Sequence, residues 1–173
     1  MRKEEKNQLI DELVSEINGN PNFYLTDIST LTVAKNNDLR RKCFNQNIRM
    51  RMVKNTLLKK AFERTGKDYS ELFPALSGST SIMFCEVGNA PAKLIKEFRQ
   101  TNDRPLLKAA WVEESAYLGD HMIDALVAIK SKNELVADVI ALLQSPAKNV
   151  ISALQSGKNK LAGIVKTLSD RPE

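Results

Sequence analysis

The chain has 173 residues, of which 42% are apolar and 27% are charged, with a formal net charge of +5. This length suits one domain with an appendage or two small domains, and the composition excludes a chain that is disordered throughout. Its longest apolar runs are five residues, and its first residues lead into no apolar segment. We therefore expect neither a membrane span nor a secretory leader.

Counts of single residue types exclude further kinds of site. The two cysteines, Cys43 and Cys85, form no disulfide framework and fit a reducing cytosol. The one histidine, His121, excludes a metal site built from several histidines. The seven glycines include no Gly-x-Gly pair and no phosphate-loop motif, so we expect neither a metal nor a cofactor.

The first quarter of the chain predicts a helix, a strand and a second helix. Apolar residues at helical spacing predict the first helix over 3–18, which the sequence Asn-Gly-Asn-Pro ends. Residues 23–28 follow as a strand. Thr32 is placed to cap a helix that runs to about residue 46.

The middle of the chain continues this alternation of strands and helices. Residues 48–53 alternate between apolar and basic side chains, which predicts a half-exposed strand. Asn55 is placed to cap a third helix, which Gly66 ends. Further strands are expected over 80–85 and 106–112, with a helix between them.

The chain beyond Gly119 carries no strand signal. Residues 120–132 and 133–144 predict short helices, and the Ser-Pro pair at 145–146 predicts the start of a new helix that runs to about residue 169. The order of elements predicts an α/β (α+β) fold, in which helices cover a small central sheet and a helical tail with a long terminal helix follows. We expect a first domain over 1–132 and the helical tail over 133–173.

The positive charge is concentrated in residues 30–60, which carry a net charge of +8. Residues 1–29 and 61–144 each carry −3, and the tail from residue 145 carries +3. We call residues 30–60 the basic segment and interpret it as a surface for a nucleic-acid backbone, with a solvated basic face as the alternative. Its cations are Lys35, Arg40, Arg41, Lys42, Arg49, Arg51, Lys54, Lys59 and Lys60.

The start of the third helix is the most specific part of the basic segment. Backbone N–H groups at a helix start are unpaired and bind phosphate well, Lys54 adds a point charge, and Thr56 adds a hydroxyl donor. The aromatic residues in and beside the segment, Phe44 and Phe62, are predicted to belong to the core. Base stacking on aromatic side chains is therefore not expected.

Apolar residues follow a heptad pattern along the predicted terminal helix, over 146–169. This stripe either packs on the protein's own core or projects toward partner helices, and the boundary at Pro146 favours projection. The residues of the stripe that we expect to bind a partner are Ala147, Val150, Ile151, Leu154, Leu161, Ile164, Val165 and Leu168.

No group of residues predicts an active site. Cys43 and Cys85 lie in apolar stretches and are predicted to be core, and His121 is predicted to be exposed in a polar turn. Glu113 and Glu114 are adjacent, so they point to opposite faces at the end of a predicted strand. We expect no enzyme.

Several stretches together make the chain similar to a known family. The most specific reads Val-Lys-Asn-Thr-Leu-Leu-Lys-Lys-Ala, over 53–61, and the match extends over nearly the whole chain. The sequence resembles the bacterial stalk-base proteins, the tenth protein of the large ribosomal subunit. It departs from them at Thr30, where many relatives have glycine, and at Ser79, where the family has proline. The other matching stretches are 31–34, 39–42, 92–98, 107–110 and 142–147.

The resemblance implies a structural protein at the base of the large-subunit stalk, ribosome-bound in the cytoplasm. Its first domain would bind large-subunit ribosomal RNA at the GTPase-associated region, beside a neighbouring ribosomal protein. The family also represses its own message by binding an RNA mimic. The expected RNA-binding residues are Thr32, Lys35, Arg40, Arg41, Arg51, Lys54, Asn55, Thr56, Lys59, Lys60 and Gly78.

The resemblance also implies a role for the last helix. That helix would carry dimers of the small acidic stalk proteins, which recruit translational GTPases. The polar residues 155–160 divide its apolar stripe into two patches, which suggest two dimers, and a third stays open. The alternative is a nucleic-acid-binding regulator outside the ribosome that dimerises through the same helix.

Overall fold

A computed structural model describes residues 3–169 of the chain, without the side chains of residues 3, 147, 154 and 157–169. The chain divides into two compact units after Lys130. Within the described residues, no helix combines the length and the apolar character that crossing a membrane requires.

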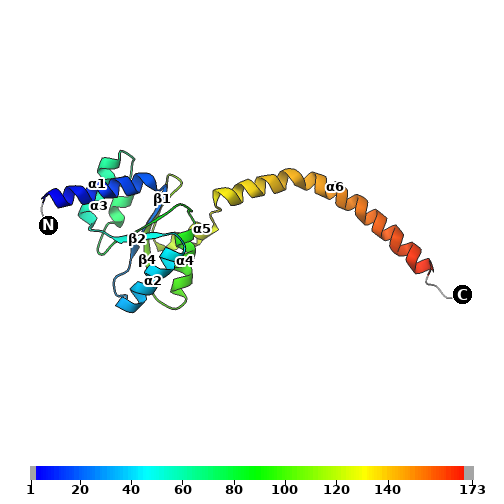
Figure 1. Cartoon of the computed structure of the whole chain (residues 1–173), viewed down its shortest axis with the longest axis horizontal. Helices are drawn as coiled ribbons and strands as arrows, with labels where there is room; N and C mark the ends of the chain where they lie inside the picture. The colour runs from blue at the N-terminus through cyan, green and yellow to red at the C-terminus, as the bar shows by residue number, and fades with distance from the viewer. Residues whose placement is uncertain (1–2, 170–173) are drawn as a thin grey trace. The chain divides into compact units, whose positions relative to one another are not determined.

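Five strands form one antiparallel sheet in the first unit (Figure 1). Their order across the sheet is β2-β3-β1-β4-β5, so β2 and β5 are the edge strands. In the centre, Phe23 of β1 lies opposite Phe84 of β3 and Trp111 of β4. The strands are β1 (Asn22–Asp27), β2 (Arg49–Met52), β3 (Ser81–Cys85), β4 (Leu106–Val112) and β5 (Ser115–Leu118).

Helices cover both faces of this sheet, and each face has its own core. Successive strand residues point to opposite faces, so Phe23 packs in one core and Tyr24 in the other. The Phe23 core lies under α1 and α3, and the Tyr24 core lies under α2, α4 and α5. The helices are α1 (Lys3–Gly19), α2 (Val33–Asn45), α3 (Asn55–Thr65), α4 (Ala90–Arg99) and α5 (Ile123–Ala128), with short 3-10 turns at Ser70–Ala75 and Asp120–Met122.

The predicted fold class is confirmed, including the helical tail with a long last helix. The predicted cap of the second helix is also confirmed, because the Thr32 hydroxyl accepts a hydrogen bond from the Lys35 N–H at 3.5 Å. Gly66 ends α3 in the left-handed conformation, with φ +76°. This conformation costs glycine little, which is why it ends helices so often.

The strand β5, over Ser115–Leu118, was not predicted from the sequence. Glu113 and Glu114 do not end the sheet but form the turn of a hairpin that leads into β5. Both have positive φ, 51° and 63°, as tight two-residue hairpin turns require. Asn and Gly are the usual signals for such a turn, and neither stands here, so the sequence pattern hides the hairpin.

The expectation of a helix break at Ser145 was also wrong. One helix, α6 (Lys132–Ser169), passes through Pro146 and includes the segment 133–144 that was predicted as a separate helix. Pro146 has no N–H to donate to the carbonyl of Leu142, so one helical hydrogen bond is missing there. Good helix formers on both sides maintain the helix, and Figure 1 shows it continuing as one curved rod.

Candidate nucleic-acid interface

The basic segment occupies α2, β2 and the first half of α3 in the first unit. Lys35, Arg40, Arg41 and Lys42 lie on α2. Arg49 and Arg51 lie on the edge strand β2. The remaining cations, Lys54, Lys59 and Lys60, lie at the start of α3 and along its first turns.

Some of these cations bind groups of their own chain. Arg51 makes two ion pairs with α1, at 3.0 Å to Glu12 and 3.1 Å to Glu16. The hydrogen bond to Glu12 contributes most to raising the pKa of Arg51. Lys42 binds Glu97 of α4 at 2.8 Å and lies over the ring of Phe98. Arg51 therefore ties α1 to the sheet, and Lys42 ties α2 to α4, in addition to the positive charge that both supply.

Other cations remain open to a partner. Arg41 has only an exposed contact with Asp38 at 3.8 Å, which contributes little. Arg40 reaches the Met50 carbonyl at 3.4 Å, and Lys59 lies over the ring of Phe73. Among the described residues, no ion-pair partner is found for Lys35, Arg49, Lys54 and Lys60.

The start of α3 differs from the prediction that Asn55 caps it. The cap residue is Lys54, and no side chain of the described residues caps the helix there. Asn55 is the first helical residue, and its amide donates to the carbonyls of Leu76 at 3.1 Å and Gly78 at 2.8 Å. In the described part of the chain, the N–H groups of Asn55 and Thr56 have no acceptor, as an anion site at a helix start requires.

The loop before β3, residues 76–79, is held by its carbonyl groups. The Asn55 amide donates hydrogen bonds to the carbonyls of Leu76 and Gly78. The Lys108 ammonium of β4 donates to the carbonyls of Ser77 and Ser79. Burial lowers the pKa of Lys108. In a trans peptide the N–H points opposite to the carbonyl, so the following N–H groups point away from these two donors. Within residues 3–169, the N–H groups of Ser77, Gly78 and Ser79 find no acceptor.

The two cysteines and the histidine do not contribute to this basic surface. Cys43 and Cys85 are buried, which confirms the prediction that both belong to the core. Burial raises the pKa of Cys43 to about 11 and that of Cys85 to about 12, so both thiols stay protonated at neutral pH. His121 is exposed, as predicted. The described residues contain no cluster of His, Cys, Asp and Glu that would hold a metal ion.

The prediction that Phe44 belongs to the core was wrong, whereas that for Phe62 is confirmed. The ring of Phe44 is 81% exposed, and that of Phe62 is buried. The buried stripe of α2 consists of Leu39 and Cys43. Phe44 is one residue beyond Cys43, which turns it about 100° away from that stripe.

The predicted partner stripe lies on α6, in the second unit. Val150 and Ile151 are exposed, at 60% and 53%. The side chains of Ala147, Leu154, Leu161, Ile164, Val165 and Leu168 lie outside the described set. Exposed apolar residues at helical spacing also occupy the first part of α6, outside the predicted stripe: Leu135, Val136, Val139, Ile140, Leu142 and Leu143.

Comparisons with known proteins identify the class. The family model described as "Ribosomal protein L10" matches residues 1–100. A protein of Christiangramia forsetii named large ribosomal subunit protein uL10 is 55% identical, over 99% of both chains. Proteins of the same name are 47% identical in Flavobacterium johnsoniae, over 94% of this chain and 96% of the relative, and 37% identical in Salinibacter ruber, over 98% and 96%.

These matches define a ribosomal protein of the large subunit. The chain belongs to the ribosomal protein L10 family, that of the uL10 proteins. The resemblance noted in the sequence is therefore confirmed at the level of the family.

Proposed function

We propose that the first part of the chain binds large-subunit ribosomal RNA and that the last helix carries dimers of acidic stalk proteins. The domains are residues 1–132 and the tail 133–173, with 146–169 as the partner-binding part of the tail. In this role the protein forms the base of the large-subunit stalk, beside a neighbouring ribosomal protein, and supports the recruitment of translational GTPases. It acts on the ribosome, in the cytoplasm, and has no enzymatic activity.

The observation that carries the RNA-binding proposal is the grouping of open cations with open N–H groups. Lys54 stands at the start of α3, where the N–H groups of Asn55 and Thr56 find no acceptor within the described chain. The neighbouring loop of 76–79 adds further N–H groups, because its carbonyls are bound by Asn55 and Lys108. Cations and free N–H groups together are what a phosphate backbone binds.

The expected RNA-binding residues then divide into two kinds. Lys35, Arg40, Arg41, Lys54 and Lys60 are placed for direct phosphate contact, as are the N–H and hydroxyl of Thr56. The others shape the surface as well: Thr32 by capping α2, Asn55 and Gly78 by fixing the loop, Lys59 by its contact with Phe73, and Arg51 by its ion pairs with α1.

The experiment that tests the proposal is a salt titration of RNA binding. The probe is a transcript of the GTPase-associated region, and the variant is Arg40→Ala/Arg41→Ala/Lys54→Ala in the full chain. Each phosphate interaction that the variant removes should lower the slope of log K against log salt by about 0.7–0.9. The matched control is Lys6→Ala/Lys67→Ala/Lys93→Ala, which removes the same charge from exposed sites outside the basic segment.

The control should keep nearly the wild-type slope, since its charges lie away from the proposed interface. Equal slopes for the two triple variants would show that net charge alone attracts RNA, and the proposed interface would be wrong. If the wild-type chain does not bind the transcript at low salt, the RNA-binding proposal is wrong.

A further inference from the structure

Phe44 is an exposed aromatic ring in the middle of the basic segment. Its ring is 81% exposed, at the C-terminal end of α2. A single exposed apolar residue is ordinary on a protein surface. Phe44 differs from that case in what surrounds it, namely arginines on its own helix face and a groove beside it.

Helical spacing puts two arginines on the face of α2 that carries Phe44. Residues three and four apart on a helix lie on one face, and Phe44 follows Arg41 by three residues and Arg40 by four. Both arginines are exposed, as is Asn37 one turn earlier on the same side. The outer face of α2 therefore presents two guanidinium groups followed by an aromatic ring.

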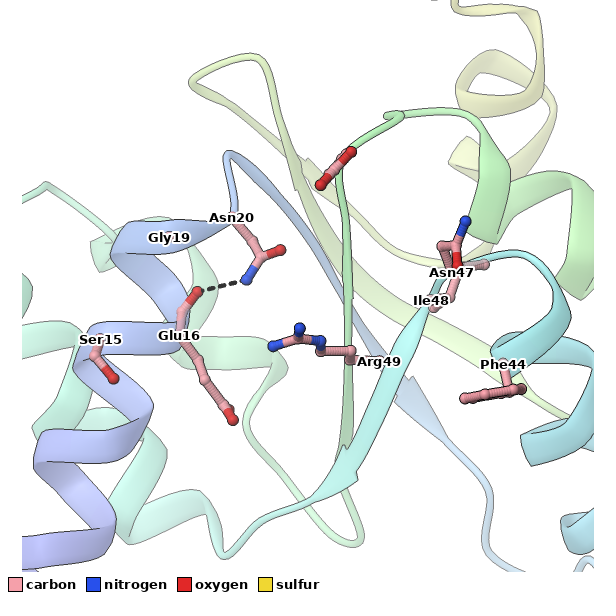
Figure 2. A pocket seen from close by; sticks show the side chains of 9 residues that line it. Ser15, Glu16, Gly19, Asn20, Phe44, Asn47, Ile48 and Arg49 are labelled. Atoms are coloured by element: carbon pink, nitrogen blue, oxygen red, sulfur yellow. Dashed lines mark hydrogen bonds between the residues drawn. The ribbon is translucent and has the colours of Figure 1, made fainter.

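The groove lies between the C-terminal part of α1, the turn from α2 to β2, and the end of β3. Figure 2 shows the ring of Phe44 on one side of it, Arg49 in the middle, and Glu16 with Asn20 on the other. Its volume is about 670 Å³, within the range of small-molecule sites. Among the described residues Arg49 has no ion-pair partner, so its guanidinium is open to a ligand in the groove.

The charges in the groove favour a base there over a phosphate. Two carboxylates, Glu16 and Glu86, line it together with Arg49. Carboxylates repel phosphate but accept hydrogen bonds from the amino groups of bases. The phosphates are then better placed along the outer face of α2, where Arg40 and Arg41 lie and Asp38 makes only a long, exposed contact with Arg41.

We propose that Phe44 is a stacking platform for one unpaired nucleobase of the bound RNA, which enters the groove while Arg40 and Arg41 bind the adjoining phosphates. This inference rests on the proposed function, because it requires that the chain bind RNA. Aromatic side chains bind single-stranded bases by stacking, and arginine planes do so as well. The surface therefore recognises an unstacked nucleotide in addition to the phosphate backbone.

Substitution of Phe44 in the full chain separates stacking from charge. Phe44→Ala should raise the Kd for the GTPase-associated transcript by about 5- to 140-fold, the usual loss for one stacked base. The slope against salt should not change, since no charge is removed. Phe44→Trp should retain affinity, whereas Phe44→Leu, which keeps an apolar side chain without a ring, should lose it as Phe44→Ala does. Leu118→Ala, an exposed apolar site on the opposite edge strand, is the matched control.

A second measurement identifies the stacked residue itself. Ultraviolet irradiation of the wild-type complex, followed by mass spectrometry, should place a nucleotide on the peptide that contains Phe44. Because the ring is exposed, the variants should keep the wild-type melting temperature, which checks that they fold.

The outcomes separate this inference from the proposed function. If the wild-type chain binds the transcript but Phe44→Ala binds equally well, the stacking site is wrong and the RNA-binding surface stands. If Phe44→Ala binds RNA normally but fails to enter large subunits, the ring contacts a protein, which also overturns the inference. Retention of affinity by Phe44→Leu would show simple apolar packing in place of stacking. If the wild-type chain binds no RNA, both proposals fail.

Discussion

The side-chain amide of Asn55 donates to the carbonyl oxygen of Gly78 at 2.8 Å and so ties the start of α3 to the loop before β3. The same amide donates to the carbonyl of Leu76. Two segments that carry free N–H groups and are 23 residues apart in sequence thereby lie side by side. The family motif around Asn55 thus has a structural reason in this chain that differs from helix capping.

Replacing Asn55 by alanine should affect both stability and RNA binding. The loss of two hydrogen bonds should lower the free energy of unfolding by about 1–2 kcal/mol, measured by urea denaturation. RNA affinity should fall because the loop loosens, while the salt slope stays unchanged because no charge is removed. Asn18→Ala, at an exposed position of α1, is the control. If the Asn55→Ala variant is destabilised but binds RNA as tightly as wild type, the loop of 76–79 is not part of the interface.

We expect Asp120 to make the stability of the first unit depend on pH. Burial alone would raise the pKa of this carboxyl, but hydrogen bonds from the Arg99 guanidinium and the Leu107 N–H, together with the charges of Arg99 and His121, leave it below its ordinary value of 3.8. A carboxyl whose pKa is lower in the folded state stabilises the fold above the unfolded pKa. That contribution is lost as pH falls through the folded pKa.

Asp120→Asn should therefore destabilise the protein at pH 7 by about 1 kcal/mol. The difference from wild type should shrink as pH falls below about 4, because the wild-type carboxyl then becomes neutral, as the amide is at every pH. Thermal unfolding measured between about pH 2 and pH 7 tests this. Asp103→Asn, which removes an exposed carboxyl, is the control. If the stability difference between Asp120→Asn and wild type were the same at every pH, the lowered pKa of Asp120 would be contradicted.

Much of this fold can be predicted from the sequence, and the exceptions have physical causes. Strands and helices with strong apolar patterns were predicted correctly, because burial alone dictates their periodicity. The hairpin at Glu113–Glu114 was missed because its turn uses residues that rarely adopt positive φ. Pro146 is acceptable both at a helix start and, at a cost, inside a helix, so the sequence pattern did not decide between them.

The candidate site, too, can be predicted from the sequence only in part. The basic segment is visible in the sequence as a local excess of charge. Its internal pairing is not, because the partners of Arg51 lie 35 and 39 residues away and meet it only when α1 packs on the sheet. The hydrophobicity of Phe44 favours a core position, but its helical phase puts it on the outer face of α2. Its position one residue beyond Cys43 was the available signal.

Thr30 stores backbone strain that glycine would relieve. Its φ is +70°, a region that costs residues with a side chain roughly 1–2 kcal/mol. This is the position at which, by the resemblance noted in the sequence, many relatives have glycine. Thr30→Gly should therefore raise the free energy of unfolding by about 1 kcal/mol, since glycine's greater freedom in the unfolded chain offsets part of the gain. Thr30→Ala, which keeps a Cβ, should show no such gain. Equal effects of the two substitutions would indicate that the strain is absent in solution.

Val150 and Ile151 test the partner role proposed for the last helix. Both are exposed on α6, so replacing both by serine should leave the fold intact. If they become buried against an acidic stalk protein, the double variant should bind that protein at least about 100-fold more weakly, by calorimetry with the purified partner. Asn149→Ser/Gln155→Ser, which changes exposed polar residues of the same helix, should bind normally. Unchanged binding by the Val150/Ile151 variant would exclude these residues from the interface. A lower melting temperature of the first unit in that variant would instead show that the stripe packs on its own chain.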